Sequence, residues 1–235
     1  MIKNVFYDLD GTLLPMDMDV FVKTYFKELA IKMAAHGYDP AKLPDAVWAG
    51  TGAMVANDGT KTNEEAFWEC FSKLCDVKDG DKDLFEEFYR VEFDAAKDVC
   101  GYNEKVPTLI KEVKKLGLTQ TLATNPLFPE IATRKRMSWA GLDAKDFTTF
   151  TTYENCHYCK PNTKYYEELL DKLHMRADET VMIGNDVDED MVAENIGMKV
   201  FLVTDCLLNK HNKDISKYPN GNFDDALNYI KSLVE

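Results

Sequence analysis

Short apolar runs alternate with longer amphipathic stretches along most of this chain. Five runs of strand length are bounded by polar or turn residues: Lys3–Tyr7, Thr119–Ala123, Phe147–Thr152, Thr180–Ile183 and Lys199–Val203. Next to the later runs, apolar residues recur at helical spacing, as in Val106, Leu109, Ile110 and Val113. The helices expected on this basis are Lys105–Leu116, Pro129–Ala140, Thr163–His174, Asp188–Ile196 and Asp224–Val234. Strands that alternate with helices of this length predict an α/β fold with a parallel sheet.

One region interrupts the alternation. Between Pro15 and about Asp98 the pattern predicts helices only: Asp17–Ala35, Pro44–Val55, Glu64–Leu74 and Asp81–Lys97. An insert of this size approaches the lower end of domain size. The sequence therefore predicts a core formed by residues 1–15 and 99–235, with residues 16–98 as an inserted helical cap.

Composition narrows the class of protein. The chain has 235 residues, 45% of them hydrophobic, which suits a globular protein. Its 28 basic and 41 acidic residues give a net charge of −13, which argues against a nucleic-acid or anionic-membrane binder. A small anionic substrate is still compatible with this charge, because local donors and a metal ion can override the overall field. The sequence leaves the oligomeric state open.

Targeting signals and cysteines indicate the compartment. The chain opens directly on a strand-like run, and no apolar stretch reaches the roughly 20 residues of a membrane span, so we expect a cytoplasmic protein. The six cysteines are then expected to be thiols. Cys156 and Cys159 have the spacing of half a zinc site, but no second ligand pair follows at a recognisable spacing.

Two carboxylates, Asp8 and Asp10, follow the first strand-like run, and Gly11 signals a turn. Buried unpaired charge is costly, so a cation or a reacting group is expected beside them. In an open parallel sheet, ligands bind at the carboxyl ends of the strands. One carboxylate could attack an electrophile while the other moves protons and holds a metal. The alternative is an acidic turn without function, which a bare pair of this kind would favour.

The full string Asp8-Leu9-Asp10-Gly11-Thr12 resembles the first motif of the haloacid dehalogenase-like hydrolase superfamily. Three further segments match this family's motifs in order and spacing: Ala123-Thr124-Asn125, Lys160-Pro161 and Ile183 to Asp190. The resemblance covers the chain from Met1 to about Asp205. It implies a Rossmann-like core, and a helical insert after the first motif corresponds to the C1-type cap of the superfamily.

The resemblance also implies roles for these residues. Asp8 would be the nucleophile that forms an aspartyl-phosphate, and Asp10 the general acid and base. Mg²⁺ would be held by Asp8, the backbone carbonyl of Asp10 and the fourth motif. Thr124 and Asn125 would bind phosphoryl oxygens, and Lys160 would offset the negative charge of Asp8 and the phosphoryl group.

The fourth motif departs from the family's commonest pattern. Its glycine is followed by Asn185 and then Asp186, so either residue could contact the metal. A carboxylate binds Mg²⁺ more strongly than an amide, which favours Asp186 as the main ligand. Asp190 is expected to orient a metal-bound water or Lys160. Asp188 and Glu189 are expected in a solvated first turn of a helix.

The sequence thus predicts a magnesium-dependent phosphatase acting on a small phosphorylated metabolite. There are two alternatives: a phosphomutase with the same intermediate, and a catalytically idle binding or regulatory protein on the same fold. Dehalogenases of the superfamily lack an acid at the position of Asp10. The helical insert is expected to select the substrate, with Pro15–Asp17 and Asp98–Glu104 as hinges. Gly50, Thr51 and Gly52 are candidates for this selection, since glycine lets backbone approach a ligand, although an ordinary helix-ending turn is equally compatible.

Overall fold

A five-stranded parallel sheet forms the centre of the molecule, whose computed structural model describes residues 1–234. The strands are β1 (Asn4–Tyr7), β2 (Thr119–Leu122), β3 (Thr180–Gly184), β4 (Lys199–Val203) and β5 (Asn220–Gly221). Their order is β2-β1-β3-β4-β5, and every pairing is parallel. The strand β1 therefore lies between β2 and β3, away from either edge.

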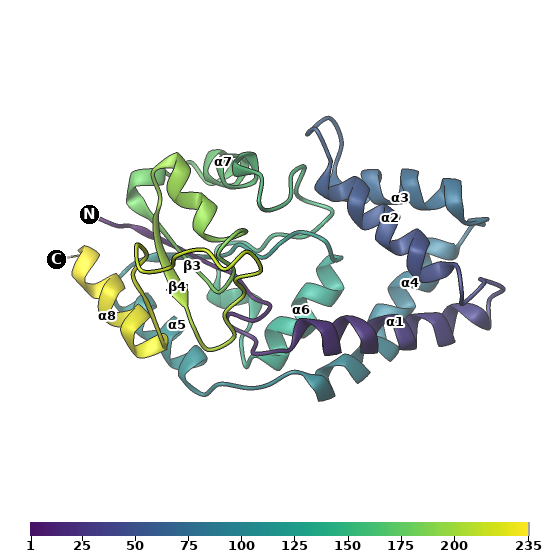
Figure 1. Cartoon of the computed structure of the whole chain (residues 1–235), viewed down its shortest axis with the longest axis horizontal. Helices are drawn as coiled ribbons and strands as arrows, with labels where there is room; N and C mark the ends of the chain where they lie inside the picture. The colour runs from purple at the N-terminus through teal and green to yellow at the C-terminus, as the bar shows by residue number, and fades with distance from the viewer. Residues whose placement is uncertain (235) are drawn as a thin grey trace.

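Both faces of the sheet are covered, as the nearly continuous apolar runs require. Val5 and Tyr7 of β1 belong to one buried cluster with the apolar faces of α5 (Lys105–Lys115) and α8 (Phe223–Val234). Phe6 points to the other face, where it joins a second cluster with residues of α7 (Thr163–Lys172). Figure 1 shows α5 and α8 on one side of the sheet and α7 on the other. The predicted α/β core is confirmed.

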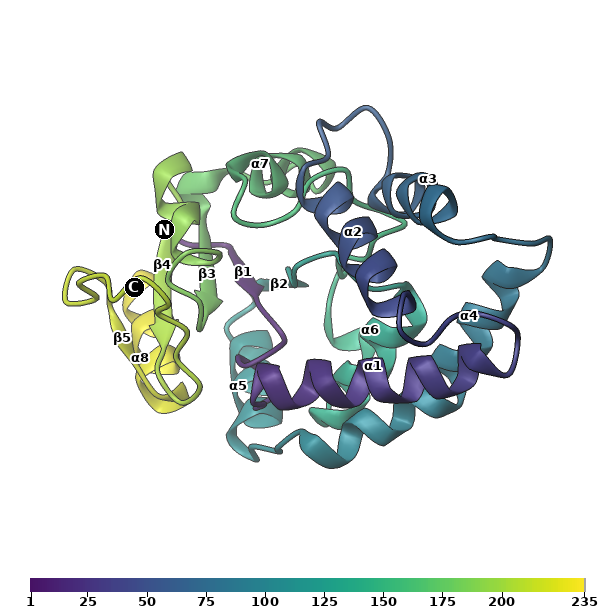
Figure 2. The same ribbon diagram turned by 45° about the vertical axis from the view of Figure 1, so that its right-hand side comes forward.

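The region between β1 and α5 is helical throughout. It contains α1 (Met18–Ala34), α2 (Leu43–Val55), α3 (Asn63–Leu74), α4 (Asp81–Arg90) and the 3-10 helix η1 (Glu92–Val99). These helices lie together at one end of the molecule, opposite the two chain termini, with α6 (Glu130–Trp139) of the sheet half next to them (Figures 1 and 2). We call α1 to α4 together with η1 the cap.

The two chain segments that connect the cap to the sheet half run side by side. Met16 and Cys100 form an antiparallel bridge, and the Gly101 N–H donates to the Pro15 carbonyl at 2.6 Å. These are the segments predicted as hinges, and their motion stays a prediction.

Three elements differ from the sequence-based prediction. Phe147–Thr152 forms only an isolated bridge between Phe150 and Leu122 at the free edge of β2, rather than a full strand. The helix expected over Asp188–Ile196 begins as a turn and continues as the 3-10 helix η4 (Met191–Ile196), because residues of the turn bond into the site described below. The fourth cap helix ends at Arg90 and is followed by η1. The sequences of the short β5 and of the 3-10 helices have no periodic pattern of apolar residues, so the sequence did not predict β5 as a strand or the other segments as 3-10 helices.

Candidate active site

The carboxylate of Asp8 lies at the carboxyl end of β1 and is held on two sides. The backbone N–H of Asp8 donates to the Ile183 carbonyl at 2.9 Å, which extends the pairing of β1 with β3 by one residue. The Thr12 hydroxyl lies 3.0 Å from Oδ2, and the Lys160 ammonium donates to Oδ1 at 2.9 Å. Asp8 is therefore fixed in position, with little freedom to rotate away from the strand end.

Lys160 is buried between two carboxylates. Its Nζ donates to Asp8 at 2.9 Å and to Asp190 Oδ1 at 2.6 Å, and only 1% of its surface is exposed. Burial by itself lowers the pKa of a lysine, but the charges of Asp190 and Asp8 outweigh burial and raise it well above its usual value. Lys160 is thus a fixed cation. Asp190 also accepts from the Asp186 N–H at 3.0 Å, so it positions both Lys160 and the fourth motif.

Asp10 forms a buried ion pair that the sequence did not reveal. Its Oδ2 is bonded to the guanidinium of Arg136 on α6, whose side chain is fully buried. Arg136 is itself held by Thr133 at 3.2 Å and lies over the ring of Phe128 at 4.4 Å. The other oxygen, Oδ1, is buried with no hydrogen-bond partner among the described residues. Burial raises the pKa of Asp10, although Arg136 opposes the shift.

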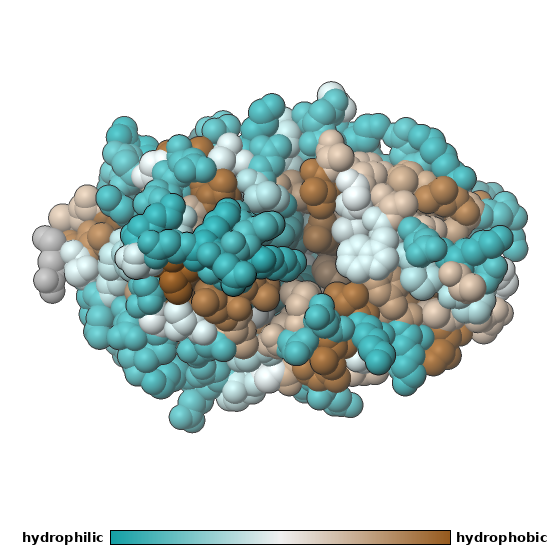
Figure 3. Space-filling model, in the orientation of Figure 1, coloured by the Kyte–Doolittle hydropathy of each residue, from teal (hydrophilic) through white to brown (hydrophobic). Residues whose placement is uncertain are grey.

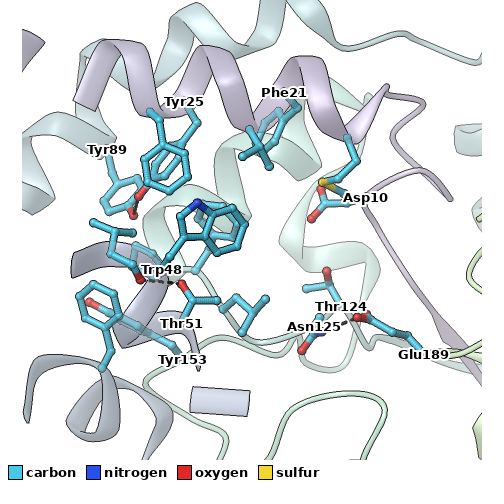
Figure 4. Close-up of a pocket in the computed structure, with 18 of the residues that line it drawn as sticks. Asp10, Phe21, Tyr25, Trp48, Thr51, Tyr89, Thr124, Asn125, Tyr153 and Glu189 are labelled. Carbon is cyan, nitrogen blue, oxygen red and sulfur yellow. Dashed lines mark hydrogen bonds between the residues drawn. The ribbon is translucent and has the colours of Figure 1, made fainter. Parts of the chain in front are cut away.

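The segment after β2 brings Thr124 and Asn125 to the same edge of the sheet. The Thr124 carbonyl accepts from the Thr151 hydroxyl at 2.6 Å and from the Tyr165 hydroxyl at 2.9 Å, which fixes the loop. The Asn125 amide donates to Glu189 Oε2 at 2.9 Å. Figure 4 shows Thr124, Asn125 and Glu189 gathered at one end of a cavity, with Asp10 nearby.

Glu189 differs from the prediction of a solvated helix turn. Its side chain faces the cavity and is bonded to Asn125, and burial raises its pKa to about 7. Asp188, by contrast, points outward and pairs with His211 and Lys213. The turn carries Glu189 inward because η4 starts only at Met191, so the acidic residues before it do not form a regular solvated helical turn.

Asn185 and Asp186 follow β3 and have different surroundings. The Asn185 amide is engaged at both ends: its Nδ2 donates to the Cys206 carbonyl at 2.6 Å, and its Oδ1 lies 2.8 Å from the Thr12 hydroxyl. Asp186 uses Oδ1 to accept from the backbone N–H groups of Asp188 and Glu189 at 2.7 and 3.0 Å. Its Oδ2 takes part in none of the hydrogen bonds found among residues 1–234.

The donor set at this edge suits a hard divalent cation. The carboxylates of Asp8 and Asp186 line the same cavity, and no main-chain hydrogen bond of the described residues uses the Asp10 carbonyl. Oxygen donors of this kind are those that Mg²⁺ prefers, with water and a substrate oxygen completing the octahedron. Residues 1–234 contain no cluster of three or more His, Cys, Asp or Glu side chains in a metal-holding arrangement. A fit therefore depends on the Asp10 carbonyl as one of the ligands.

The cavity that these residues line has a volume of about 310 Å³ and lies between the sheet edge and the cap. Figure 3 shows apolar side chains around a recess between the two halves of the molecule. The carboxylates and Thr124 occupy one end. The opposite end is aromatic and comes from the cap, as the labelled Tyr25, Tyr89 and Trp48 show in Figure 4.

The cap residues singled out from the sequence have unequal positions. Gly50, Thr51 and Gly52 all lie inside the continuous helix α2, so this segment neither ends a helix nor interrupts one. Thr51 lines the cavity and donates to the Val47 carbonyl at 2.9 Å. Gly50 instead faces Phe67, where a Cβ would come within 2.6 Å of the ring, and Gly52 has open space around it. Their role in substrate selection stays a prediction, and only Thr51 is placed for it.

Cys156 and Cys159 belong to a segment that docks against the cap. The Asn63 N–H, at the start of α3, donates to the Cys156 carbonyl at 2.8 Å. The Asn63 side chain approaches the Tyr158 carbonyl and the Cys159 sulfur, each at 3.3 Å. Both thiols are buried, and burial raises the pKa of Cys156 to about 12. The described residues give no metal cluster here, and the segment has a clear packing role.

Sequence reasoning missed two partners at the site. Arg136 occupies a position on the buried face of α6, beside Ala132, Thr133 and Met137. A charged residue at a helix position that its neighbours mark as buried needs an acidic partner, and that signal was present in the pattern. For Glu189 the sequence held no comparable signal, because its direction depends on where η4 begins.

Comparisons with known proteins agree with this architecture. The family model of haloacid dehalogenase-like hydrolases matches residues 5–203. A phosphoglycolate phosphatase of Vibrio parahaemolyticus is 26% identical over 208 residues, which cover 86% of this chain and 84% of the relative. Among solved structures, a 2-haloacid dehalogenase from Pseudomonas syringae pv. Tomato has a TM-score of 0.63 at 19% identity, over 99% of both chains. The magnesium-bound hydrolase YfnB of Bacillus subtilis has a TM-score of 0.56 at 14% identity, over 98% of this chain and 100% of its own.

The chain belongs to the haloacid dehalogenase-like hydrolase family. Within that family it is a hydrolase of phosphate monoesters, in agreement with its phosphatase relative and with the acid retained at Asp10. No helix of the described residues has both the length and the apolar character needed to cross a membrane.

Proposed function

We propose that this protein is a magnesium-dependent phosphatase of a small phosphorylated metabolite, working through an aspartyl-phosphate on Asp8. The observation that carries the proposal is the pair of carboxylates at the end of β1. Asp8 is held by Lys160, and Asp10 is held by Arg136, on the same cavity. The phosphoglycolate phosphatase relative supports a small phosphorylated metabolite as the substrate class.

The two aspartates take different roles because their partners differ. Asp8 attacks phosphorus, and the bond from phosphorus to the alcohol oxygen breaks. Asp10 gives a proton to that oxygen, which leaves as the neutral alcohol. Asp10 then takes a proton from a water molecule that attacks the aspartyl-phosphate, and inorganic phosphate and free Asp8 result. We assign this transfer to Oδ1 of Asp10, which has no hydrogen-bond partner among the described residues, since Oδ2 is bound to Arg136.

Lys160 and Thr124 support the phosphoryl group. Lys160 neutralises part of the charge on Asp8, so that a carboxylate can approach a dianionic phosphate. Thr124 lies at the same end of the cavity, and its side chain makes none of the hydrogen bonds found among the described residues. Its hydroxyl is therefore free to bind a phosphoryl oxygen, while Asn125 is held by Glu189 and orients the loop.

Mg²⁺ would be held by the Asp8 carboxylate, the Asp10 carbonyl and the Asp186 carboxylate. When bound, the ion would supply positive charge against the phosphoryl oxygens. Asp186 fits this role better than Asn185, because the Asn185 amide is already engaged at both ends. Asp190 would act through Lys160 and the Asp186 backbone.

We also propose that residues 16–98 form a cap that moves on the paired segments at Pro15–Asp17 and Asp98–Glu104. The antiparallel bridge between Met16 and Cys100 supports this motion, because the two segments that connect the cap to the sheet half lie next to each other.

We propose further that the protein acts in the cytoplasm.

The test is phosphate release from nitrophenyl phosphate and from a panel of phosphorylated sugars, acids and alcohols, with and without Mg²⁺. We expect release with Mg²⁺ and its loss with Asp8→Asn, while circular dichroism shows the fold retained. Asp10→Asn should lose more activity on alkyl phosphates than on nitrophenyl phosphate, whose leaving group needs no proton. Turnover by Asp8→Asn near the wild-type rate would remove Asp8 as the nucleophile. Transfer of phosphate to a second substrate without release would indicate a phosphomutase.

A further inference from the structure

The cap end of the cavity is built from aromatic side chains on four helices. They are Phe21 and Tyr25 of α1, Trp48 of α2, Trp68 of α3, and Phe85 and Tyr89 of α4. Most of them are buried and pack on one another, so they also form the core of the cap. The wall that a leaving group would meet is therefore aromatic and largely apolar, unlike the polar sheet edge at the other end.

Trp48 differs from the other aromatic residues of this wall because it lines the cavity without being buried. It is 52% exposed, and its ring packs against Phe26 at a centroid distance of 5.4 Å. An aromatic ring that contacts a neighbour on one side and lines a cavity on the other offers a flat surface to a ligand. Trp48 is thus the side chain in this wall with the most unburied apolar area.

Most polar groups of this wall are engaged with one another, but the Trp68 indole N–H has no hydrogen-bond partner among the described residues. The hydroxyls of Tyr25 and Tyr89 are bonded at 3.0 Å, and Thr51 donates to the Val47 carbonyl. The Lys82 ammonium lies 3.4 Å from Glu64 and over the ring of Trp68. One hydroxyl hydrogen of the tyrosine pair and the Trp68 indole N–H are left over, so the wall can serve a few neutral acceptors.

The charges around the cavity disfavour a second anion on the substrate. Seven carboxyl side chains and two lysines line it, and Lys82 is paired with a carboxylate. Lys210, the other lysine, is exposed in the loop after β4. A substrate carboxylate at the cap end would lose water without gaining a buried cation, which is costly.

We propose that the substrate is a phosphate monoester whose leaving group is an uncharged alcohol carrying an aromatic ring, which seats against Trp48. This inference rests on the proposed phosphatase function and specifies its substrate class. The cavity of about 310 Å³ leaves room for a ring beside the phosphoryl group. A small carboxylated ester such as phosphoglycolate would leave the aromatic wall uncovered.

The experiment compares esters whose leaving groups have similar acidity. Phenethyl phosphate, cyclohexylethyl phosphate and ethyl phosphate test the ring against apolar bulk and against no bulk, and phosphoglycolate tests a carboxylate. The kcat/KM of each is measured with Mg²⁺ for the wild type, Trp48→Ala and Val55→Ala. Val55 is the control, because it ends the same helix, is 45% exposed and does not line the cavity.

We expect phenethyl phosphate to have the highest kcat/KM of the four. Trp48→Ala should lower the ratio of phenethyl to ethyl phosphate by about tenfold, the size of a strong aromatic pair, and Val55→Ala should leave the ratio unchanged. Three results would overturn the inference: phosphoglycolate as the best substrate, cyclohexylethyl equal to phenethyl phosphate, or a Trp48→Ala ratio equal to that of the wild type. In those cases release of phosphate still supports the phosphatase. Absence of turnover on every ester, nitrophenyl phosphate included, would overturn both proposals.

Discussion

Replacing Arg136 with methionine tests how far the buried ion pair with Asp10 supports the fold. Methionine keeps much of the volume and the contact with Phe128, so the main change is the loss of charge. Removing one partner of a buried pair typically costs about 3–5 kcal/mol, because the other charge stays buried without compensation. The Asp10 side chain is 16% exposed at the cavity, so water offsets part of this cost. We therefore expect a loss of about 3 kcal/mol in the free energy of unfolding.

The assay is equilibrium urea unfolding followed by circular dichroism, in the presence of a chelator. Arg134→Met is the matched control, because Arg134 lies on the same helix and pairs with Glu130, but both side chains are about half exposed. Its loss should stay below about 1 kcal/mol. The double variant with Asp10→Asn removes both charges and should recover more than half of the loss. An Arg136→Met loss no larger than that of Arg134→Met would refute the reasoning.

Three further predictions concern the metal, the cap contact and the cavity wall. Asp186→Ala should raise the Mg²⁺ concentration for half-maximal activity far more than Asn185→Ala does; the reverse order, from magnesium titrations of phosphate release, would contradict our assignment. Asn63→Ala removes a fully buried amide that bonds to Asn57 and approaches the Tyr158 carbonyl, so urea unfolding should show a loss of about 1–3 kcal/mol, and no loss would mean that this contact contributes nothing. Thr51→Val should change the relative rates across the ester panel, whereas Gly52→Ala, which lies away from the cavity, should not; equal profiles for both variants would exclude Thr51 from selection.

The sequence predicted most of the core because its signals there are local. The strand over Lys199–Val203 has the bounds that the structure gives, and the helix beginning at Thr163 and the start of α5 at Lys105 also agree. Each carries a buried face whose period is visible within one element. The predicted strand over Phe147–Thr152 is only partly formed: three main-chain hydrogen bonds join residues 148–151 to Gln120 and Leu122 of β2, but only one bridge results.

The site could be predicted as a set of residues but not as a network. The motifs predict Asp8 and Thr124 at strand ends and Lys160 after a strand and a turn, and the structure brings them to one cavity edge or next to it. The ion pair of Asp10 joins positions 126 residues apart, and no local pattern links them. The direction of Glu189 likewise follows from the length of a turn, which periodicity does not encode.

The paired crossings at Pro15 and Gly101 have a consequence for how this chain could be rebuilt. The chain leaves the sheet half at Pro15 and returns to it at Gly101, and a hydrogen bond of 2.6 Å joins these two residues. The cap is the chain segment between them. A short turn from Pro15 to Gly101 would close that gap without moving β1 or α5. We therefore expect the cap to be exchangeable at this one place, provided that a replacement covers Phe128 and Trp139, which pack against cap residues.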